Sequence, residues 1–239
     1  MAYVRMDVKS EVMDMYTSLI VLLPDGAENE DIPVVFLLHG LSDNATNWSR
    51  FTAAERYAAS YGVAVVMPEV QRSFYTDMKY GLDYFKYVTD ELPALIRRYF
   101  RLNCTSMYVM GLSMGGYGAL KCALTYPERY KGAAAFSCVS DVKALLEVSS
   151  EGRRLEAAAI FGEDFPEKDD LFALAEKAVS LPPFYITCGD EDRLFPHSEM
   201  IRDTLIAKGA DVTFEHWEGG HEWAFWDRSL SRAFELFFS

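Results

Sequence analysis

The sequence lacks an excess of basic residues and any long apolar run. Lys and Arg number 23 against 36 Asp and Glu, so the 239-residue chain carries a formal net charge of −13. Binding to nucleic acid or to an anionic membrane needs basic surface, which argues against both partners. No apolar run approaches the roughly 18 residues of a membrane span, and the charged N-terminal stretch is unlike a secretory signal. We therefore expect a protein without nucleic-acid or membrane partners.

Cysteine is also scarce, and its spacing matters more than its number. The four cysteines (Cys104, Cys122, Cys138 and Cys188) are far apart, and no C-x-x-C motif occurs. This spacing argues against a zinc or redox site, so we expect no metal. Three of the four lie in apolar stretches, which favours buried free thiols in a reducing compartment. The expectation is a cytoplasmic protein.

What the chain does contain is an alternation of apolar strands and helical patterns. Half of its residues are apolar and a quarter are charged, as in a globular protein. The first two expected strands alternate polar and apolar residues, which suits an antiparallel edge; the later ones are continuous apolar runs, which suit buried parallel strands. The expected strands are 3–9, 17–23, 34–38, 63–67, 107–110, 133–136, 184–188 and 212–217.

Helical patterns lie between these strands. They cover 48–60, 83–99, 115–125, 198–208 and 224–237, and Pro93 is expected to divide or kink the second. This order predicts an α/β fold with one doubly wound, mostly parallel sheet of about eight strands and an antiparallel N-terminal edge. We expect residues 1–239 to form a single domain. Residues 140–180 are too long for a plain crossover, so we interpret them as a small cap-like insertion over the carboxyl edge of the sheet.

The strongest chemical signal is the G-x-S-x-G motif from Gly111 to Gly115. It follows an apolar strand and opens a helix, which is the context of a nucleophile elbow. In such an elbow a sharp turn forces the serine into a strained conformation, and only small residues at the two glycine positions leave room for it. The motif predicts Ser113 as the nucleophile.

A serine hydroxyl needs a base to remove its proton and a third group to orient that base. The sequence offers four histidines: His39, His197, His216 and His221. Only His221 follows the serine in the expected order and lies in a glycine-rich loop after the last strand. We therefore expect His221 to be the base, and the other three histidines to have structural or surface roles.

The orienting acid is expected just past a strand end, between the serine and the base. Asp190, Glu191 and Asp192 follow Gly189 at the end of the 184–188 strand. Two residues between Gly189 and Asp192 give the chain room to turn back over the sheet, which favours Asp192. Asp190 is the competitor, although aspartate at that place is more often a turn former. The resulting order Ser…Asp…His is that of α/β-hydrolases.

Two backbone N–H groups should stabilise the oxyanion of the tetrahedral intermediate. One is expected from Met114, which follows the nucleophile. The other is expected from Leu41, in the turn after the third strand.

The motifs that carry these residues resemble those of the esterase D family. They are HGLSDNATNW, FYTDMKYGLDYFKYVTDELP, GLSMGGYGALK, CGDEDRLF and GGHEWAFWD. Within that family they most resemble the compact bacterial tributyrin, acetyl and feruloyl esterases. The resemblance implies an α/β-hydrolase fold, cofactor-free hydrolysis of carboxylic esters, and a homo-oligomer. It implies the same triad (Ser113, Asp192 and His221) and the same oxyanion donors (Leu41 and Met114).

The aromatic residues near these motifs are candidates for the substrate pocket. Trp48 follows the oxyanion turn and Trp223 follows the base by two residues, so we expect both to bind substrate. Tyr75, Tyr80 and Trp226 are weaker candidates. The sequence predicts a serine carboxylesterase for small-molecule esters with short or aromatic acyl groups. The alternatives are a thioesterase similar to S-formylglutathione hydrolase or an acyltransferase with the same triad, a peptidase, and a non-catalytic binding protein.

Overall fold

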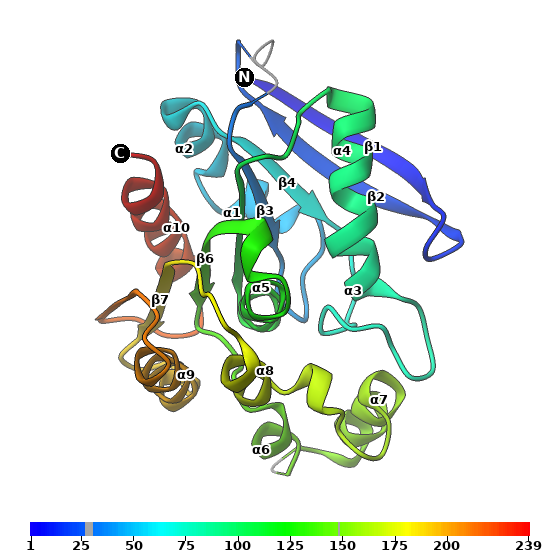
Figure 1. Ribbon diagram of the computed structural model, residues 1–239, viewed down its shortest axis with the longest axis vertical. Helices are drawn as coiled ribbons and strands as arrows, with labels where there is room; N and C mark the ends of the chain where they lie inside the picture. Colours follow the sequence, from blue (N-terminus) through cyan, green and yellow to red (C-terminus); the bar gives the residue numbers. More distant parts are fainter. Residues whose placement is uncertain (27–30, 148) are drawn as a thin grey trace.

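The computed structural model describes residues 1–26, 31–147 and 149–239. Eight strands of these described ranges form one twisted sheet with the order β1-β2-β4-β3-β5-β6-β7-β8 (Figure 1). The strands are β1 (Ala2–Ser10), β2 (Met15–Leu23), β3 (Val34–Leu38), β4 (Ala64–Pro68), β5 (Met107–Leu112), β6 (Tyr130–Phe136), β7 (Phe184–Gly189) and β8 (Val212–Trp217). The predicted doubly wound α/β fold is confirmed.

The two kinds of strand pattern correspond to two kinds of pairing. β1 pairs antiparallel with β2, and β2 pairs antiparallel with β4, whereas every other neighbouring pair is parallel. Every residue of β3 and of β4 is buried, because helices cover both faces of the parallel part of the sheet. In β1 mainly alternate residues are protected, as expected for an edge strand.

Helices cover both faces of the sheet. One face packs against α4 (Leu92–Phe100), α5 (Met114–Thr125), α8 (Leu171–Lys177) and α9 (Phe195–Ala207). The other packs against α1 (Asn47–Phe51), α2 (Ala54–Tyr61) and α10 (Trp223–Phe238). Figure 1 shows α5 at the centre of the first layer, directly after the central strand β5.

The expected helix 48–60 is in fact two helices, α1 and α2. The chain is extended at Thr52, whose hydroxyl donates to the Trp48 carbonyl and so caps the end of α1. The next N–H, of Ala53, donates to Asp227 of α10 at 2.8 Å instead of to a helical carbonyl. This tertiary hydrogen bond gives the Ala53 N–H a partner outside the helix, at the break between α1 and α2.

The expected helix 83–99 is continuous from Tyr84 to Phe100, but its middle is widened. It comprises α3 (Tyr84–Lys86), a π-helical turn at Tyr87–Glu91 and α4. Pro93 stands in the first turn of α4, directly after the wider turn. A proline has no N–H to donate, and its ring clashes with the preceding helical turn. The wider π-helical turn before Pro93 is consistent with this interruption of the helical hydrogen bonds.

The segment 140–180 contains α6 (Val142–Glu147), α7 (Glu151–Phe161), a 3-10 turn (Glu167–Asp169) and α8. We call it the cap segment; Figure 1 shows α6 and α7 together at the end of the molecule opposite the N-terminus. Two side chains of α5 hold it in place. Lys121 forms a buried ion pair with Asp169, and the Tyr117 hydroxyl donates to the Asp169 carbonyl at 2.6 Å. The helix that begins after Ser113 is therefore joined directly to the cap segment.

The four cysteines are all free and buried, as the apolar context of Cys122, Cys138 and Cys188 predicted for those three. Burial raises the pKa of the Cys122 and Cys138 thiols to about 12, so both stay protonated at neutral pH. Within the described ranges, no helix has the length and apolar character needed to cross a membrane.

Candidate active site

Ser113 lies at the sharp turn between β5 and α5. Its backbone has φ 53° and ψ −116°, a conformation that residues other than glycine rarely adopt. Two hydrogen bonds hold this conformation: the Ser113 N–H donates to the Phe136 carbonyl at 2.8 Å, and the Tyr117 N–H donates to the Ser113 carbonyl at 3.1 Å. Strained backbone of this kind persists only where its surroundings determine it, which is common at active sites.

The two glycines of the motif make this turn sterically possible. A Cβ on Gly111 would lie 2.3 Å from the Gly115 carbonyl oxygen, and a Cβ on Gly115 would lie 2.3 Å from the Leu38 carbonyl oxygen. Both obstacles are backbone atoms, which cannot move aside as a flexible side chain can. The G-x-S-x-G pattern is thus required by the close approach of α5 to the ends of β3 and β5.

Replacing Gly115 by alanine should therefore lower the free energy of unfolding by about 3 kcal/mol or more, because the new methyl group overlaps the β3 backbone. Gly152 is the matched control. It lies on the exposed part of α7 with open space around its Cβ position, so Gly152→Ala should stabilise the protein by about 0.5–1 kcal/mol. Urea denaturation would measure both changes. A Gly115→Ala variant as stable as the wild type would contradict the steric account.

His221 and Asp192 come together from two loops at the carboxyl end of the sheet. The His221 Nδ1 donates to Asp192 Oδ2 at 2.8 Å. Backbone contacts bring the loops together: the Glu191 N–H donates to the Gly219 carbonyl at 3.1 Å, and the Gly219 N–H donates to the Glu191 carboxylate at 2.6 Å. With Nδ1 bound to Asp192, Nε2 is the ring nitrogen left to accept a proton.

The Asp192 carboxylate is completely shielded from solvent. Burial by itself raises its pKa, but hydrogen bonds from His221 and from the Leu194 N–H outweigh that effect and hold the pKa below the ordinary value. The Leu194 N–H lies 2.9 Å from Oδ1, so each carboxylate oxygen has its own donor. The carboxylate is therefore ionised and fixed in orientation at neutral pH.

The structure places the other histidines elsewhere. His39 is buried, its Nδ1 donates to the Gly40 carbonyl at 2.8 Å, and its Nε2 accepts the Val70 N–H at 3.2 Å. His197 accepts the Asp141 N–H at 3.2 Å. His216 pairs with Asp190 at 2.7 Å, and both side chains are about half exposed. The competing acid Asp190 therefore has a partner other than His221.

Ser113 and His221 line the same pocket, which has a volume of about 320 Å³. We call it the Ser113 pocket; Leu41, Trp223 and Trp226 line it as well. The His221 ring packs edge-on against Trp226 with 4.8 Å between ring centroids, and the Trp226 indole N–H donates to the Ser137 hydroxyl at 3.1 Å. Trp223 therefore lines the pocket, as the sequence predicted.

Trp48 does not line this pocket, contrary to the expectation from its position after the oxyanion turn. It is 1% exposed, and its indole N–H donates to the Leu38 carbonyl at 3.0 Å. Helix α1 turns the ring inward, against the sheet, where it packs edge-on against Trp223 with 5.3 Å between centroids. Trp48 belongs to the core, where it packs against the pocket residue Trp223.

Met114 directly follows Ser113 in the chain, and Leu41 lines the Ser113 pocket. Met114 is the first residue of α5, where an N–H has no partner within the helix. In the described ranges, neither N–H donates to another group of the protein. The His39 bond to the Gly40 carbonyl orients the peptide that carries the Leu41 N–H. The oxyanion role of these two N–H groups stays a prediction.

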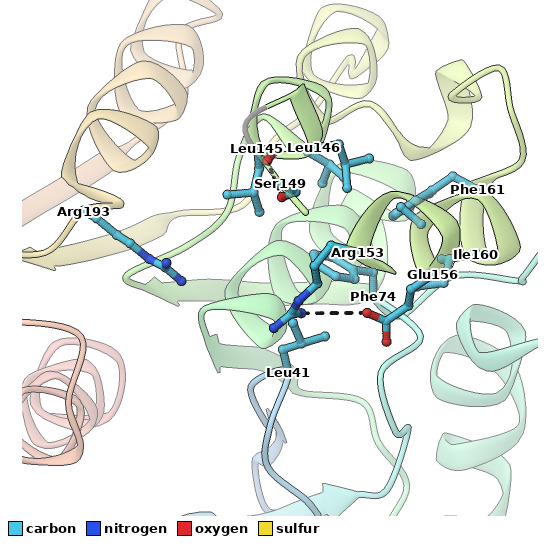
Figure 2. Close-up of a pocket in the computed structure, with 12 residues that line it drawn as sticks. Leu41, Phe74, Leu145, Leu146, Ser149, Arg153, Glu156, Ile160, Phe161 and Arg193 are labelled. Atoms are coloured by element: carbon cyan, nitrogen blue, oxygen red, sulfur yellow. Dashed lines mark hydrogen bonds and ion pairs between the residues drawn. The ribbon is translucent and has the colours of Figure 1, made fainter. Parts of the chain in front are cut away.

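A second pocket of about 150 Å³ lies between the Ser113 turn and the cap segment, and we call it the cap pocket (Figure 2). Its lining is mainly apolar and includes Leu41, Phe74, Leu145, Leu146, Ile160 and Phe161. Leu41, Arg153 and Arg193 line this pocket and the Ser113 pocket alike. The sequence did not point to Arg153 or Arg193, although Arg193 directly follows Asp192 in the chain and could have been found from that position.

A strained serine at a strand–helix turn and a histidine–aspartate pair on the same edge of an eight-stranded α/β sheet define a serine hydrolase of the α/β-hydrolase class. The sequence model of the Esterase family, described as "Putative esterase", matches residues 10–237. The chain belongs to this family and is an esterase D-like serine carboxylic ester hydrolase.

Individual relatives agree with this assignment. The chain is 27% identical to an acetyl esterase of Caldicellulosiruptor saccharolyticus, over 98% of this chain and 97% of the relative. Among solved structures it is similar to a fluorophosphonate-binding serine hydrolase of Staphylococcus aureus, with 30% identity, 100% and 98% coverage and a TM-score of 0.92. It is also similar to an S-formylglutathione hydrolase of the same organism, with 31% identity, 100% and 99% coverage and a TM-score of 0.89.

Proposed function

We propose that the enzyme hydrolyses carboxylic esters with short acyl groups through an acyl-enzyme on Ser113. The observation that carries the proposal is the His221–Asp192 hydrogen bond of 2.8 Å beside a strained serine in one pocket. His221 Nε2 takes the Ser113 proton while the serine oxygen attacks the ester carbonyl. Asp192 holds the imidazole in the tautomer that this step needs and stabilises its cation.

Leu41 and Met114 are the proposed oxyanion donors. Met114 directly follows the nucleophile, Leu41 lines the Ser113 pocket, and neither N–H has another partner in the described part of the protein. Donors fixed before the reaction stabilise the charge that develops on the carbonyl oxygen, and losing one such donor costs about 2.7–4 kcal/mol in enzymes where this has been measured. The Gly40 carbonyl is held by His39, so the Leu41 donor needs little reorganisation.

His221 passes the proton on to complete acylation, and deacylation repeats the same transfers with water in place of the serine hydroxyl. The ester C–O bond breaks as the alcohol leaves with the proton from His221. A water molecule then gives its proton to His221 and attacks the acyl-enzyme, which releases the acid and restores Ser113. These steps need no group beyond the side chains and backbone donors already named.

The cap pocket supports the proposed preference for short acyl groups. Its volume is about 150 Å³, and its lining is mainly apolar. Leu41 lines both pockets, so an acyl group whose carbonyl meets the Leu41 N–H can extend directly into the cap pocket. Transfer of its apolar atoms from water contributes about 0.8 kcal/mol per CH₂ until the pocket is filled. The acetyl esterase relative agrees with a small acyl group.

A panel of p-nitrophenyl esters from acetate to decanoate, with methyl ferulate and S-formylglutathione, tests the proposal. We expect kcat/KM to be highest for acetate to butyrate and to fall for longer chains, because they exceed the cap pocket. Methyl ferulate as the best substrate would replace the short-acyl preference by an aromatic one. A clear preference for S-formylglutathione would favour the thioesterase function, which the Staphylococcus aureus relative suggests.

A further inference from the structure

Two arginines lie where the Ser113 pocket and the cap pocket meet. Arg153 comes from α7 of the cap segment, and Arg193 comes from the loop directly after Asp192. Both line both pockets. Figure 2 shows the Arg193 side chain extending toward the pocket from one side and Arg153 lying beside Leu41 on the other. Both arginines therefore border the pocket that Ser113 lines.

Acidic side chains do not neutralise this pair. Arg193 forms no ion pair or hydrogen bond with any residue that the structure describes. Arg153 lies 3.8 Å from Glu156, but Arg72 already binds both oxygens of that carboxylate, one of them at 2.8 Å. Glu156 is therefore shared between Arg72 and Arg153, and it does not pair with Arg193.

Glu156 lines the cap pocket, whereas Asp43 lines the Ser113 pocket, and the Asp43 oxygens have hydrogen-bond partners of their own. Oδ2 accepts the Gly40 N–H at 3.1 Å, and Oδ1 accepts the Asn47 amide at 2.9 Å. With Glu156 paired to Arg72, Arg153 and Arg193 stand against Asp43 alone, which leaves an excess of positive charge along the two pocket linings in a chain whose net charge is −13. A local excess of positive charge on an otherwise negative protein attracts an anionic ligand. Guanidinium groups match the planar geometry of a carboxylate.

We propose that the preferred esters carry a carboxylate on the leaving alcohol, which Arg153 and Arg193 bind while a short acyl group occupies the cap pocket. This inference rests on the proposed esterase function. The cap pocket is small and mainly apolar, so it suits the acyl group. The alcohol must leave on the His221 side, in the larger Ser113 pocket, which both arginines also line. The carboxylate of the alcohol is unchanged by the reaction.

Two acetyl esters with the same ring test this substrate class. 4-Acetoxybenzoate carries the carboxylate on its leaving group, and methyl 4-acetoxybenzoate is its neutral counterpart. Both form the same acetyl-enzyme, so the difference between them must appear in kcat/KM for acylation. We expect the ratio of the anionic to the neutral kcat/KM to fall about tenfold in Arg153→Gln and in Arg193→Gln, and further in the double variant.

Arg154→Gln is the matched control. Arg154 neighbours Arg153 on α7 and lines neither pocket, and its guanidinium donates to the Ser149 carbonyl at 2.8 Å. We expect its ratio to equal that of the wild type. Salt is a second readout: raising NaCl from about 0.05 to 0.5 M should lower the wild-type ratio, because the attraction is screened, and should change it less in the double variant.

The outcomes separate this inference from the function on which it rests. Wild-type turnover of the neutral ester tests the esterase function alone, and its absence would overturn that function. With the neutral ester turned over, an unchanged ratio in the arginine variants would overturn the inference. Equal losses on both esters would also overturn it. A third pair, mono-4-nitrophenyl adipate and its methyl ester, carries the charge on the acyl group. A larger arginine effect on that pair would refute the assignment to the alcohol.

Discussion

Ser113→Ala should lower kcat for ester hydrolysis by about 10⁵- to 10⁶-fold, because it removes the atom that attacks the carbonyl and leaves only the binding pocket and the oxyanion donors. The pocket itself should persist, since the hydrogen bonds that hold the turn involve the Ser113 backbone. Hydrolysis of p-nitrophenyl acetate measures the rate, and a fluorophosphonate should label the wild type but not the variant. Residual activity within about 100-fold of the wild type would assign the nucleophile to another residue.

Ser113→Gly separates the loss of the nucleophile from the strain of the turn. It should be as inactive as Ser113→Ala, but glycine adopts a φ of 53° without the steric cost that alanine retains. We expect Ser113→Gly to unfold about 2–4 °C above Ser113→Ala, which corresponds to about 1 kcal/mol for a chain of this size. Thermal unfolding measured by circular dichroism gives the comparison. An equal or lower melting temperature for the glycine variant would show that the turn stores no strain.

Asp192→Asn should lower kcat about 10³- to 10⁴-fold at neutral pH. The Leu194 N–H would keep its acceptor if the asparagine carbonyl occupied the Oδ1 position. The amide NH₂ would then face His221 Nδ1 and force the proton onto Nε2, the nitrogen that must accept the Ser113 proton. The pocket would keep its shape but hold the wrong tautomer. Steady-state kinetics on p-nitrophenyl acetate would measure the loss.

Asp190→Asn is the matched control for that experiment. Asp190 forms the same kind of pair with His216, at 2.7 Å, but both side chains are about half exposed. Neither residue lines the Ser113 pocket. The control should therefore retain wild-type kcat within about twofold, because a pair at the surface contributes little. The reverse result, with activity lost in Asp190→Asn and kept in Asp192→Asn, would transfer the orienting role to the competing acid.

Much of the fold could be predicted because the burial of a strand determines the pattern of apolar and polar residues within a short stretch of sequence. The apolar runs of β3 and β4 are buried on both faces, and the alternating pattern at the N-terminus forms the antiparallel edge. The helix boundaries were less predictable. The break between α1 and α2 involves a hydrogen bond between Ala53 and Asp227, which are far apart in the chain. Such a partner has no signal in the local sequence.

The five residues around Ser113 determined the turn by themselves, because its steric requirement is local: any Cβ at Gly111 or Gly115 would collide with backbone. Chain order and the loop glycines were enough to select His221, and the distance from a strand end was enough to select Asp192. Only the tertiary structure decided what surrounds them. Trp48 and Trp223 have similar sequence contexts, yet one lies in the core and the other lines the pocket. The lining depends on which distant segments converge, so only the tertiary structure brings Arg153 of α7 and Arg193 of the loop after β7 to the same two pockets.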